Sequence, residues 1–315
     1  MAEPIIPPVE TGLIEKELSE GRFLRHTNKG GNEIYIIDGR EAPEVMREIG
    51  RLREIAFRTA GGGTGKECDI DQYDLMDPPC MQLVVWDPHE RIITGGYRFI
   101  LGKDIRFNPD GSPRIATSHM FDFSKRFIDE MLPRTIELGR SFVRLEYQST
   151  RVGAKAIFAL DNLWDGLGAL TVLHPEIKYL FGKFTMYPSY ERECRDLLLY
   201  FLNKHFPDPD MLARPFHPLE TPSDTDRFAK ILDNDNFHDD YLVLNSEIRR
   251  HGINIPPLVN AYMNLSPTMK IFGTAINDEF GDVEETGIFL TIDDIFEEKK
   301  QRHIETFRYE ETTPQ

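Results

Sequence analysis

Residues 137–143 read Glu-Leu-Gly-Arg-Ser-Phe-Val, and this stretch bears most strongly on the fold. Together with its neighbours over 135–145 it is rich in β-formers, which predicts a strand. Strict alternation would place Glu137 and Ser141 on one face of that strand and Arg140 on the other. The glycine inside it is typical of a bulge, which would break the alternation. The sequence leaves both arrangements open.

The segments on either side of this strand predict a mixed α/β domain. Strands are expected at 33–38, 81–87, 91–101, 135–145, 177–187, 270–276 and 287–292, and helices at 43–57, 124–132, 154–170, 189–205, 255–264 and near 293–300. The runs 81–87 and 91–101 flank a short polar turn and predict an antiparallel hairpin. Mostly antiparallel pairs joined by crossover helices give a mixed sheet flanked by helices.

Composition places the chain among globular proteins. Its 315 residues suffice for a substantial core, with 40% of them apolar and 29% charged, which excludes a disordered or fibrous chain. No apolar run reaches the roughly 18 residues that a membrane span needs. There is no secretory signal at the N-terminus, and three separated cysteines fit a reducing compartment. We therefore expect a soluble cytoplasmic protein.

The charge balance argues against a nucleic-acid partner. The chain carries 37 basic and 53 acidic residues, a formal net charge of −16, which repels nucleic acid and anionic lipid. Residues 134–155 are locally basic, with five basic side chains against two glutamates. This region is either an ordinary solvated face or a docking surface for an acidic partner.

Charged residues recur in the segments that precede the 137–143 stretch. The series comprises Arg53, Phe57, Asp69, Asp71, Asp74 and Arg98. Arg53 and Phe57 lie one helical turn apart and share a face, the aspartates follow a glycine-rich loop, and Arg98 stands in a predicted strand. Arginines beside clustered carboxylates indicate bidentate pairs that fix geometry. They form either part of a substrate site or a structural cluster that holds a loop.

In order and spacing, this series and the 137–143 stretch resemble two related groups of acyltransferases. One is the acyl-homoserine-lactone synthases, and the other is the bacterial amino-acid N-acyltransferases of ornithine-lipid and glycine-lipid synthesis, often labelled hemolysins. The second group is the better match, because 137–143, 180–182 and 272–294 all resemble it. Residues 255–285 are most similar to its glycine-lipid branch. The resemblance covers roughly residues 45–295.

The resemblance implies the GNAT fold, an α/β arrangement with a mixed, mostly antiparallel sheet and an insertion before the last two strands. Residues 1–44 would be an N-terminal extension with the first strand, and 45–205 the GNAT core. Residues 206–250, rich in proline and aspartate, would be an irregular insertion. Residues 251–315 would complete the sheet and end in an acidic tail.

The same resemblance implies transfer of a 3-hydroxy fatty acyl group from an acyl carrier protein thioester to the amine of glycine. The product would be N-acylglycine, a lyso-glycine lipid, released with peripheral membrane contact. No cofactor is expected beyond the carrier's phosphopantetheine arm, and no metal. Ornithine is an alternative acceptor, coenzyme A an alternative donor, and acetyl-CoA-dependent acetylation of a small amine an alternative reaction. A lipid-binding or hemolytic protein is the alternative that is not an enzyme.

Residue roles follow by carrying the family pattern onto this chain. An α-amino group has a pKa of about 8 and must lose a proton before it attacks. Glu137 is the expected general base, unless it pairs with Arg140 or Arg98. Catalytic residues would then be Glu137, Arg140 and Tyr190, with Tyr187 or Tyr190 protonating the leaving thiolate unless these tyrosines belong to the core. The substrate-binding set is Arg53, Phe57, Asp69, Asp71, Asp74, Arg98 and Ser141, and the carrier-docking set is Arg144, Arg151 and Lys155.

Two further features concern the donor and the transition state. The segment 148–154 lacks the glycine spacing with which acetyl-CoA enzymes of this fold cradle a pyrophosphate. A carrier protein presents a single phosphodiester, so this departure favours a carrier-protein donor. A bulge over Gly139–Ser141 would present backbone N–H groups to a tetrahedral oxyanion.

Overall fold

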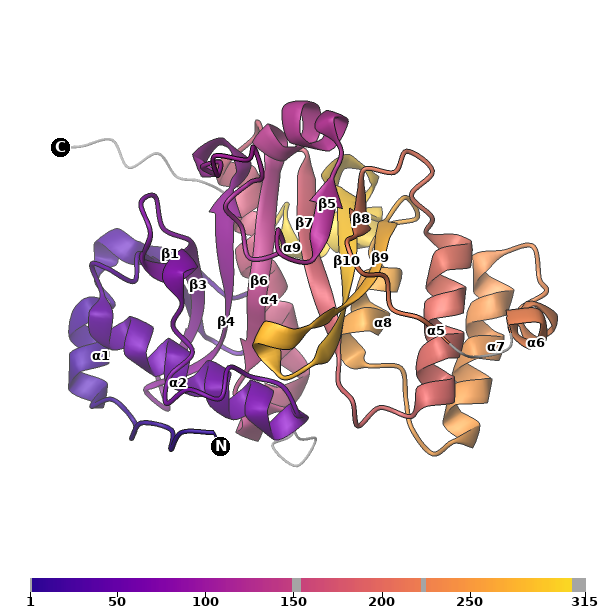
Figure 1. Ribbon diagram of the computed structural model, residues 1–315. Helices are drawn as coiled ribbons and strands as arrows, with labels where there is room; N and C mark the ends of the chain where they lie inside the picture. The colour runs from indigo at the N-terminus through magenta and orange to yellow at the C-terminus, as the bar shows by residue number, and fades with distance from the viewer. Residues whose placement is uncertain (1, 149–153, 222–224, 308–315) are drawn as a thin grey trace.

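A computed structural model describes residues 2–148, 154–221 and 225–307 of the chain (Figure 1). Its helices are α1 Thr11–Glu17, α2 Pro43–Ala60, α3 Gln72–Leu75, α4 Ala154–Leu173, α5 Arg192–His205, α6 Thr225–Ile231, α7 Phe237–Arg250, α8 Pro257–Met263 and α9 Glu297–His303. Its strands are β1 Phe23–His26, β2 Glu33–Ile37, β3 Met81–Asp87, β4 Ile92–Leu101, β5 Phe121–Phe123, β6 Thr135–Val143, β7 Tyr179–Met186, β8 Ala213–Pro215, β9 Lys270–Asn277 and β10 Val283–Thr291. Within the described residues, no helix is long and apolar enough to cross a membrane.

One eight-stranded sheet organises the molecule. Its strand order is β1-β2-β3-β4-β6-β7-β10-β9. β6 and β7 pair in parallel, whereas the other neighbouring pairs are antiparallel. The predicted mixed, mostly antiparallel sheet is confirmed, as is the hairpin formed by β3 and β4. β6 and β7 are joined through α4, the crossover helix that a parallel pair requires.

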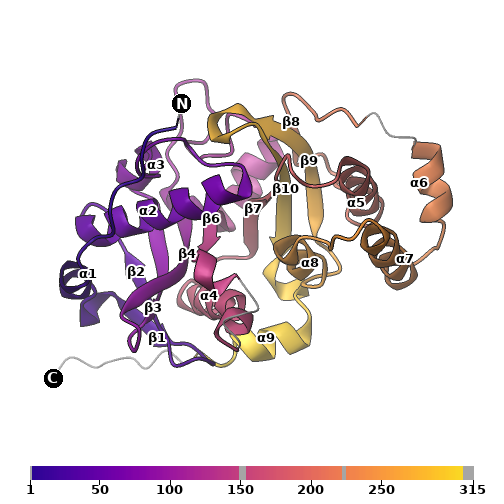
Figure 2. The ribbon, with the colours of Figure 1, turned by 90° about the horizontal axis from the view of Figure 1, so that it is seen from below.

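The sheet is covered by helices on both faces (Figure 2). α2 lies over one face, where Val45, Ile49 and Leu52 pack against Val84 and Trp86. On the opposite face, α4, α5 and α8 form the largest apolar cluster of the described chain. This arrangement follows from the sequence of α2, whose apolar residues recur at helical spacing and form one buried stripe.

A smaller layer packs on the other half of the sheet face that α2 covers. β5 pairs with β8, and a π-helical turn over Phe127–Met131 follows β5. Phe127 lies within aromatic contact of Phe181 on β7, of Phe272 on β9 and of Phe289 on β10. Two separate apolar clusters therefore stand on this face, with a strip of sheet between them that carries charged side chains.

The segment 206–250, which was expected to be irregular, contains β8, α6 and α7, so that description is wrong. α7 begins at the Asn236 cap, whose side chain accepts the N–H of Asp239 at 2.9 Å, and it buries Leu244 and Ile248. It is tied to α5 because Asp240 binds Lys204 at 2.6 Å. The prolines and aspartates of this segment lie mostly in the turns and caps around these helices, which is why their number obscured the helical spacing.

α9 closes the structure against α4 at a glycine. A Cβ built on Gly168 would lie 2.0 Å from the backbone carbonyl oxygen of His303, a distance that neither helix can accommodate without moving. The contact is fixed beside it by Asp165, whose carboxylate lies 2.7 Å from Nδ1 of His303. Gly168 therefore sets how closely the two helices approach.

We predict that Gly168→Ala lowers the free energy of unfolding by about 1–3 kcal/mol, the usual range for overpacking. Without a clash, replacing a helical glycine by alanine would stabilise the protein by up to about 1 kcal/mol. A lower free energy of unfolding therefore identifies the clash as the dominant effect. Urea unfolding of the variant against Gly21→Ala, where nothing lies within 4 Å of the added Cβ, checks the prediction. A stabilised Gly168→Ala protein would contradict it.

Candidate active site

β6 and β7 pair at their beginnings and then separate. Their register holds only for Thr135–Tyr179, Ile136–Leu180 and Glu137–Phe181. Beyond that point β6 follows β4 as far as the pair Val143–Gly95, and β7 follows β10 over its whole length. Because each strand keeps its antiparallel neighbour, the two diverge and leave a V-shaped gap in the sheet.

A bulge in β6 lies at the start of the gap. Gly139 pairs with Arg98 and Phe142 with Gly96, so two residues of β6 oppose the single Tyr97 of β4. Arg140 has a φ of 49°, in the left-handed region. Of the two arrangements that the sequence left open, this strand has the bulge rather than strict alternation.

The bulge decides which side chains share a face. It turns Arg140 to the α2 face, where its guanidinium binds Asp69 and contacts the ring of Phe280 at 4.2 Å. Ser141 instead lies beside Tyr97, which belongs to the apolar cluster of the opposite face together with Leu138. Arg140 thus joins Arg98 on the charged side of the sheet.

The two arginines and three aspartates of the predicted series form one connected network with Arg140 on the α2 face. Arg53 and Arg98 are both almost completely buried. Arg53 contacts Asp74 at 3.3 Å, and Arg98 contacts Asp71 at 2.7 Å and Asp74 at 3.5 Å. Arg140 contacts Asp69 at 2.9 Å and Asp71 at 3.5 Å. The network ties the loop after α2 to strands β4 and β6.

The loop itself is shaped by its aspartates. Asp71 caps α3, accepting the N–H groups of Tyr73 and Asp74, while the Asp74 side chain accepts the N–H of Asp71 at 3.0 Å. Gln82 on β3 bridges the network, accepting from Arg53 and donating to Asp74. Asp71 and Asp74 therefore each have a structural partner as well as an arginine.

Burial and charge act in opposite directions on these groups. Burial alone would raise the pKa of Asp71, but Arg98 and Arg140 hold that pKa well below its usual value. Burial alone would lower the pKa of Arg98, but Asp74 and Asp71 raise it well above the usual value. Asp71 and Arg98 are accordingly charged at neutral pH.

Glu137 differs from the aspartates. Its side chain is buried, with 2% of the residue exposed, and burial raises its pKa although Arg98 and Lys183 oppose that effect. Among the ion pairs within 4 Å that the described residues form, none includes Glu137, so the expected pair with Arg140 or Arg98 is not made. A buried carboxylate with a raised pKa and no ion partner is suited to accept a proton.

A cavity of about 840 Å³ passes through the gap between β6 and β7. On the α2 face it is bordered by Phe57, Arg140 and two further charged residues of the sheet. On the opposite face its wall is apolar and includes Leu160, Trp164, Leu180, Phe184, Leu258 and Leu290. The exposed residues Gln148, Ser189 and His251 mark its mouth. One continuous space thus joins a charged compartment to an apolar one.

Four of the site residues predicted from the sequence line the cavity: Phe57, Arg140, Ser141 and Tyr190. The other members of the substrate set lie behind the wall in the network, and Glu137 lies behind the wall outside the network. Tyr190 stands just before α5 and donates a hydrogen bond to the Asn254 carbonyl at 3.0 Å. Tyr187 also lines the cavity, and burial raises its pKa to about 12.

The carrier-docking set is only partly visible. Arg144 lies just after β6 and pairs with Glu146 at 3.2 Å. Arg151 lies outside the described residues, and Lys155 lies in α4 at a position whose side chain is not described. The docking surface therefore stays a prediction.

Sequence reasoning missed the ion pair of Lys183 and Glu285, which completes the charged border of the cavity. Glu285 also accepts from Thr185 at 3.1 Å and from Asn277 at 3.0 Å. Burial lowers the pKa of Lys183 against the attraction of Glu285. A single lysine within the apolar run 180–184 was the available signal, because a buried strand rarely carries one.

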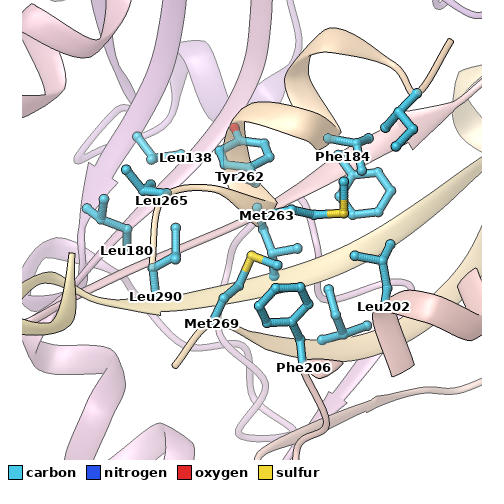
Figure 3. Packing of buried hydrophobic residues seen from close by; sticks show 14 of the residues in the cluster. Leu138, Leu180, Phe184, Leu202, Phe206, Tyr262, Met263, Leu265, Met269 and Leu290 are labelled. Atoms are coloured by element: carbon cyan, nitrogen blue, oxygen red, sulfur yellow. The ribbon is translucent and has the colours of Figure 1, made fainter. Parts of the chain in front are cut away.

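Sequence reasoning also missed two tyrosines on the opposite face. Tyr97 of β4 and Tyr262 of α8 both line the cavity, and their hydroxyl oxygens lie 3.2 Å apart. Figure 3 shows Tyr262 among apolar side chains such as Leu138 and Met263. Nothing in the local sequence distinguishes these two residues from ordinary core tyrosines, because their proximity depends on how α8 packs.

Glu191, Cys194 and His251 lie near the mouth, with ligand atoms within 4.8 Å of one another. Glu191 caps α5 by accepting the N–H of Cys194 at 2.7 Å. Burial and the Glu191 carboxylate raise the pKa of the Cys194 thiol to about 12. Helix capping accounts for the contact of Glu191 with Cys194.

Comparison with known proteins gives concordant results. Residues 52–157 match the acetyltransferase (GNAT) domain family. The chain is 60% identical over 305 residues to a glycine N(alpha)-acyltransferase of Phocaeicola vulgatus, covering 97% of this chain and 94% of the relative. It is 62% identical to a glycine N(alpha)-acyltransferase of Bacteroides thetaiotaomicron, with 97% and 90% covered.

Among solved structures, a CoA-dependent acyl-homoserine lactone synthase with SAM and isopentyl-CoA aligns with 53% of this chain and 72% of its own. The sequence identity is 16% and the TM-score 0.29. This similarity is too weak to bear on the arrangement of the site.

We predict that Asp71→Asn lowers the free energy of unfolding by about 2–3 kcal/mol at pH 7, because two buried guanidinium groups lose a charged partner. Asparagine retains the capping acceptor of α3, so the change isolates the charge. Since the pKa of Asp71 is depressed in the folded state, its stabilisation is present above the unfolded pKa of about 3.9 and is lost as pH falls below it.

Denaturant unfolding between pH 7 and pH 3 measures this effect. The difference between the wild type and Asp71→Asn should shrink as pH falls. Asp122→Asn is the matched control, because its partner Arg214 is largely exposed and such surface pairs contribute under about 1 kcal/mol. Equal losses in the two variants would refute the special role of the network.

Proposed function

The chain belongs to the family of the glycine N(alpha)-acyltransferases and is an acyltransferase of the GNAT fold, and on that basis we propose that it acylates the amine of glycine with a 3-hydroxy fatty acid. The donor we propose is the thioester of an acyl carrier protein. The product would be an N-acylglycine, which has the character of a lyso-lipid.

The cavity through the gap is the observation that carries this proposal. Its volume of about 840 Å³ lies in the upper part of the range of roughly 300–1,000 Å³ that small-molecule sites occupy. The wall beyond Ser141 is apolar, as a fatty acyl chain requires. An acetyl group would leave most of this apolar surface uncovered, which favours a long acyl chain over acetylation.

The charged compartment suits a small amino acid. Arg140 is the one arginine of the described network that lines the cavity, and Lys183 lies on the same face. An arginine holds a carboxylate through two parallel hydrogen bonds. We therefore assign the carboxylate of glycine to Arg140, with the amine directed toward the gap.

Glu137 would remove a proton from the amine, directly or through one water. It precedes the cavity-lining Leu138 in β6 and shares the electrostatic surroundings of Arg98, Lys183 and Arg140. Its raised pKa is closer to the pKa of the amine, which makes proton transfer from the amine to Glu137 less unfavourable. The nucleophile and its base would then both lie on the α2 face.

The neutral amine would attack the thioester carbonyl within the gap, forming the C–N bond and a tetrahedral oxyanion. Past the pair Glu137–Phe181, β6 and β7 have no ladder in the described chain, so backbone N–H groups near the bulge are available as oxyanion donors. Collapse would break the C–S bond, and Tyr187 or Tyr190 would protonate the thiolate. The attacking nitrogen would lose a second proton as the amide forms. Of the two protons that the glycine ammonium gives up, one ends on the sulfur and the other passes through Glu137 to solvent.

The direct test combines the protein with 3-hydroxypalmitoyl carrier protein and glycine, with detection of the product by mass spectrometry. N-(3-hydroxypalmitoyl)glycine is the expected product. Parallel reactions with the coenzyme A thioester, with acetyl-CoA and with a panel of amino acids that includes ornithine identify the donor and the acceptor. Absence of any acylated amino acid, or acetylation alone, would overturn the proposal.

We predict that Glu137→Gln lowers kcat by at least about 100-fold, the lower end of a general base's contribution. Because the pKa of Glu137 is raised on folding, the charged carboxylate costs stability at neutral pH. The variant should therefore keep or raise its free energy of unfolding. In the wild type, activity should fall as pH drops through the raised pKa of Glu137, and the variant should lack that dependence.

Steady-state kinetics across pH, together with thermal unfolding, check this prediction. Glu130→Gln is the control, since Glu130 is exposed and stands outside the cavity wall. Unfolding of the Glu137→Gln protein would instead assign Glu137 a structural role, and an unchanged kcat would remove it from the mechanism.

A further inference from the structure

Three hydroxyl groups meet on the apolar side of the gap. The Tyr97 and Tyr262 hydroxyl oxygens lie 3.2 Å apart, and Ser141 interacts with the hydroxyl of Tyr97. Both tyrosines are buried, with 2% and 6% of the residue exposed, and all three residues line the cavity. We call Tyr97, Tyr262 and Ser141 the hydroxyl cluster.

The surroundings of the hydroxyl cluster are apolar. The ring of Tyr262 contacts Trp164 edge-on, with centroids 5.9 Å apart, and belongs to the same apolar cluster as Leu138 and Phe184. In Figure 3 its hydroxyl oxygen stands at the edge of the group, away from Met269. A polar group in such surroundings needs hydrogen-bond partners.

The three hydroxyls do not satisfy one another completely. They carry three protons, whereas the two contacts among them use two. Either oxygen of the Tyr97–Tyr262 contact can be the donor. Whichever way the two contacts run, one O–H of the hydroxyl cluster has no acceptor within the cluster. An unsatisfied buried donor costs about 1–3 kcal/mol.

We propose that the hydroxyl cluster binds the 3-hydroxyl group of the acyl donor and thereby selects 3-hydroxyacyl over unsubstituted acyl chains. This inference rests on the proposed function. With the thioester carbonyl at the bulge, the third carbon lies two bonds farther along the chain, on the side of Ser141. A hydroxyl there would accept the remaining O–H of the hydroxyl cluster, whereas a plain chain leaves that donor unsatisfied.

The test compares kcat/KM for 3-hydroxypalmitoyl and palmitoyl thioesters on the same carrier protein. The wild type should prefer the 3-hydroxy substrate by about 10-fold or more, which corresponds to one satisfied buried donor. Tyr97→Phe and Tyr262→Phe should lower kcat/KM for the 3-hydroxy substrate and leave that for palmitoyl unchanged or higher. The preference should then fall toward unity.

Tyr241→Phe is the matched control, because the Tyr241 hydroxyl also donates to α8, at Asn260 Oδ1 (2.6 Å), but outside the cavity. It should retain the wild-type preference. If the tyrosine pair were structural, or acted as the acid for the leaving thiolate, Tyr97→Phe and Tyr262→Phe would lower kcat/KM for both substrates alike. The ratio of the two values would then stay unchanged. That result, or a wild type without preference, would overturn the proposal.

A binding measurement separates this inference from the proposed function. Calorimetry without glycine gives the ratio of Kd values for 3-hydroxypalmitoyl- and palmitoyl-pantetheine, in the wild type and in Tyr97→Phe. A wild-type ratio that collapses in the variant supports the hydroxyl cluster even if no N-acylglycine is formed. Equal Kd values in the wild type refute it even if the enzyme acylates glycine.

Discussion

The separation of β6 from β7 is the constraint on which the rest of the site depends. A parallel pair that ends after Glu137 and Phe181 leaves an opening in the sheet, and such an opening is costly unless something fills it or satisfies its backbone groups. Both strands tolerate it because each is paired on its other side, β6 with β4 except at the bulge and β7 with β10 over its whole length. The cavity is thus a consequence of strand pairing rather than of a loop that can close or open.

The bulge at Arg140 makes the two sides of that opening chemically different. A single extra residue in β6 moves Arg140 to the face of Arg98 and leaves Ser141 facing Tyr97. Charged groups gather on the α2 face, where the aspartate loop neutralises the arginines, and hydroxyls and apolar side chains gather on the other. An amino acid and a fatty acyl chain have opposite solvation requirements, and this division allows each to lie in a compartment that suits it.

The buried ion network is expensive to form, because several charges leave water together. Its geometry nevertheless serves the site. Asp71 and Asp74 hold Arg98 and Arg53 in fixed positions, and Asp69 holds Arg140 at the cavity wall. Glu137 stands within this field with no ion partner among the described residues, so its proton affinity is set by burial and by positive charges that do not bind it directly. Fixed charges around a free carboxylate are a means of tuning a base without blocking it.

The sequence alone determined the order of the main strands along the chain, the amphipathic α2 and the hairpin of β3 and β4, because each depends on side chains close together in the chain. It left open whether β6 carries a bulge near Gly139. It also singled out the aspartates and arginines of the network by their clustering. It did not reveal α6 and α7, the pair Lys183–Glu285 or the contact of Tyr97 with Tyr262. Those depend on tertiary structure: Lys183 and Glu285 are brought together by the register of β7 with β10, and Tyr262 reaches Tyr97 only through the packing of α8, so that no local pattern in the chain records either distance.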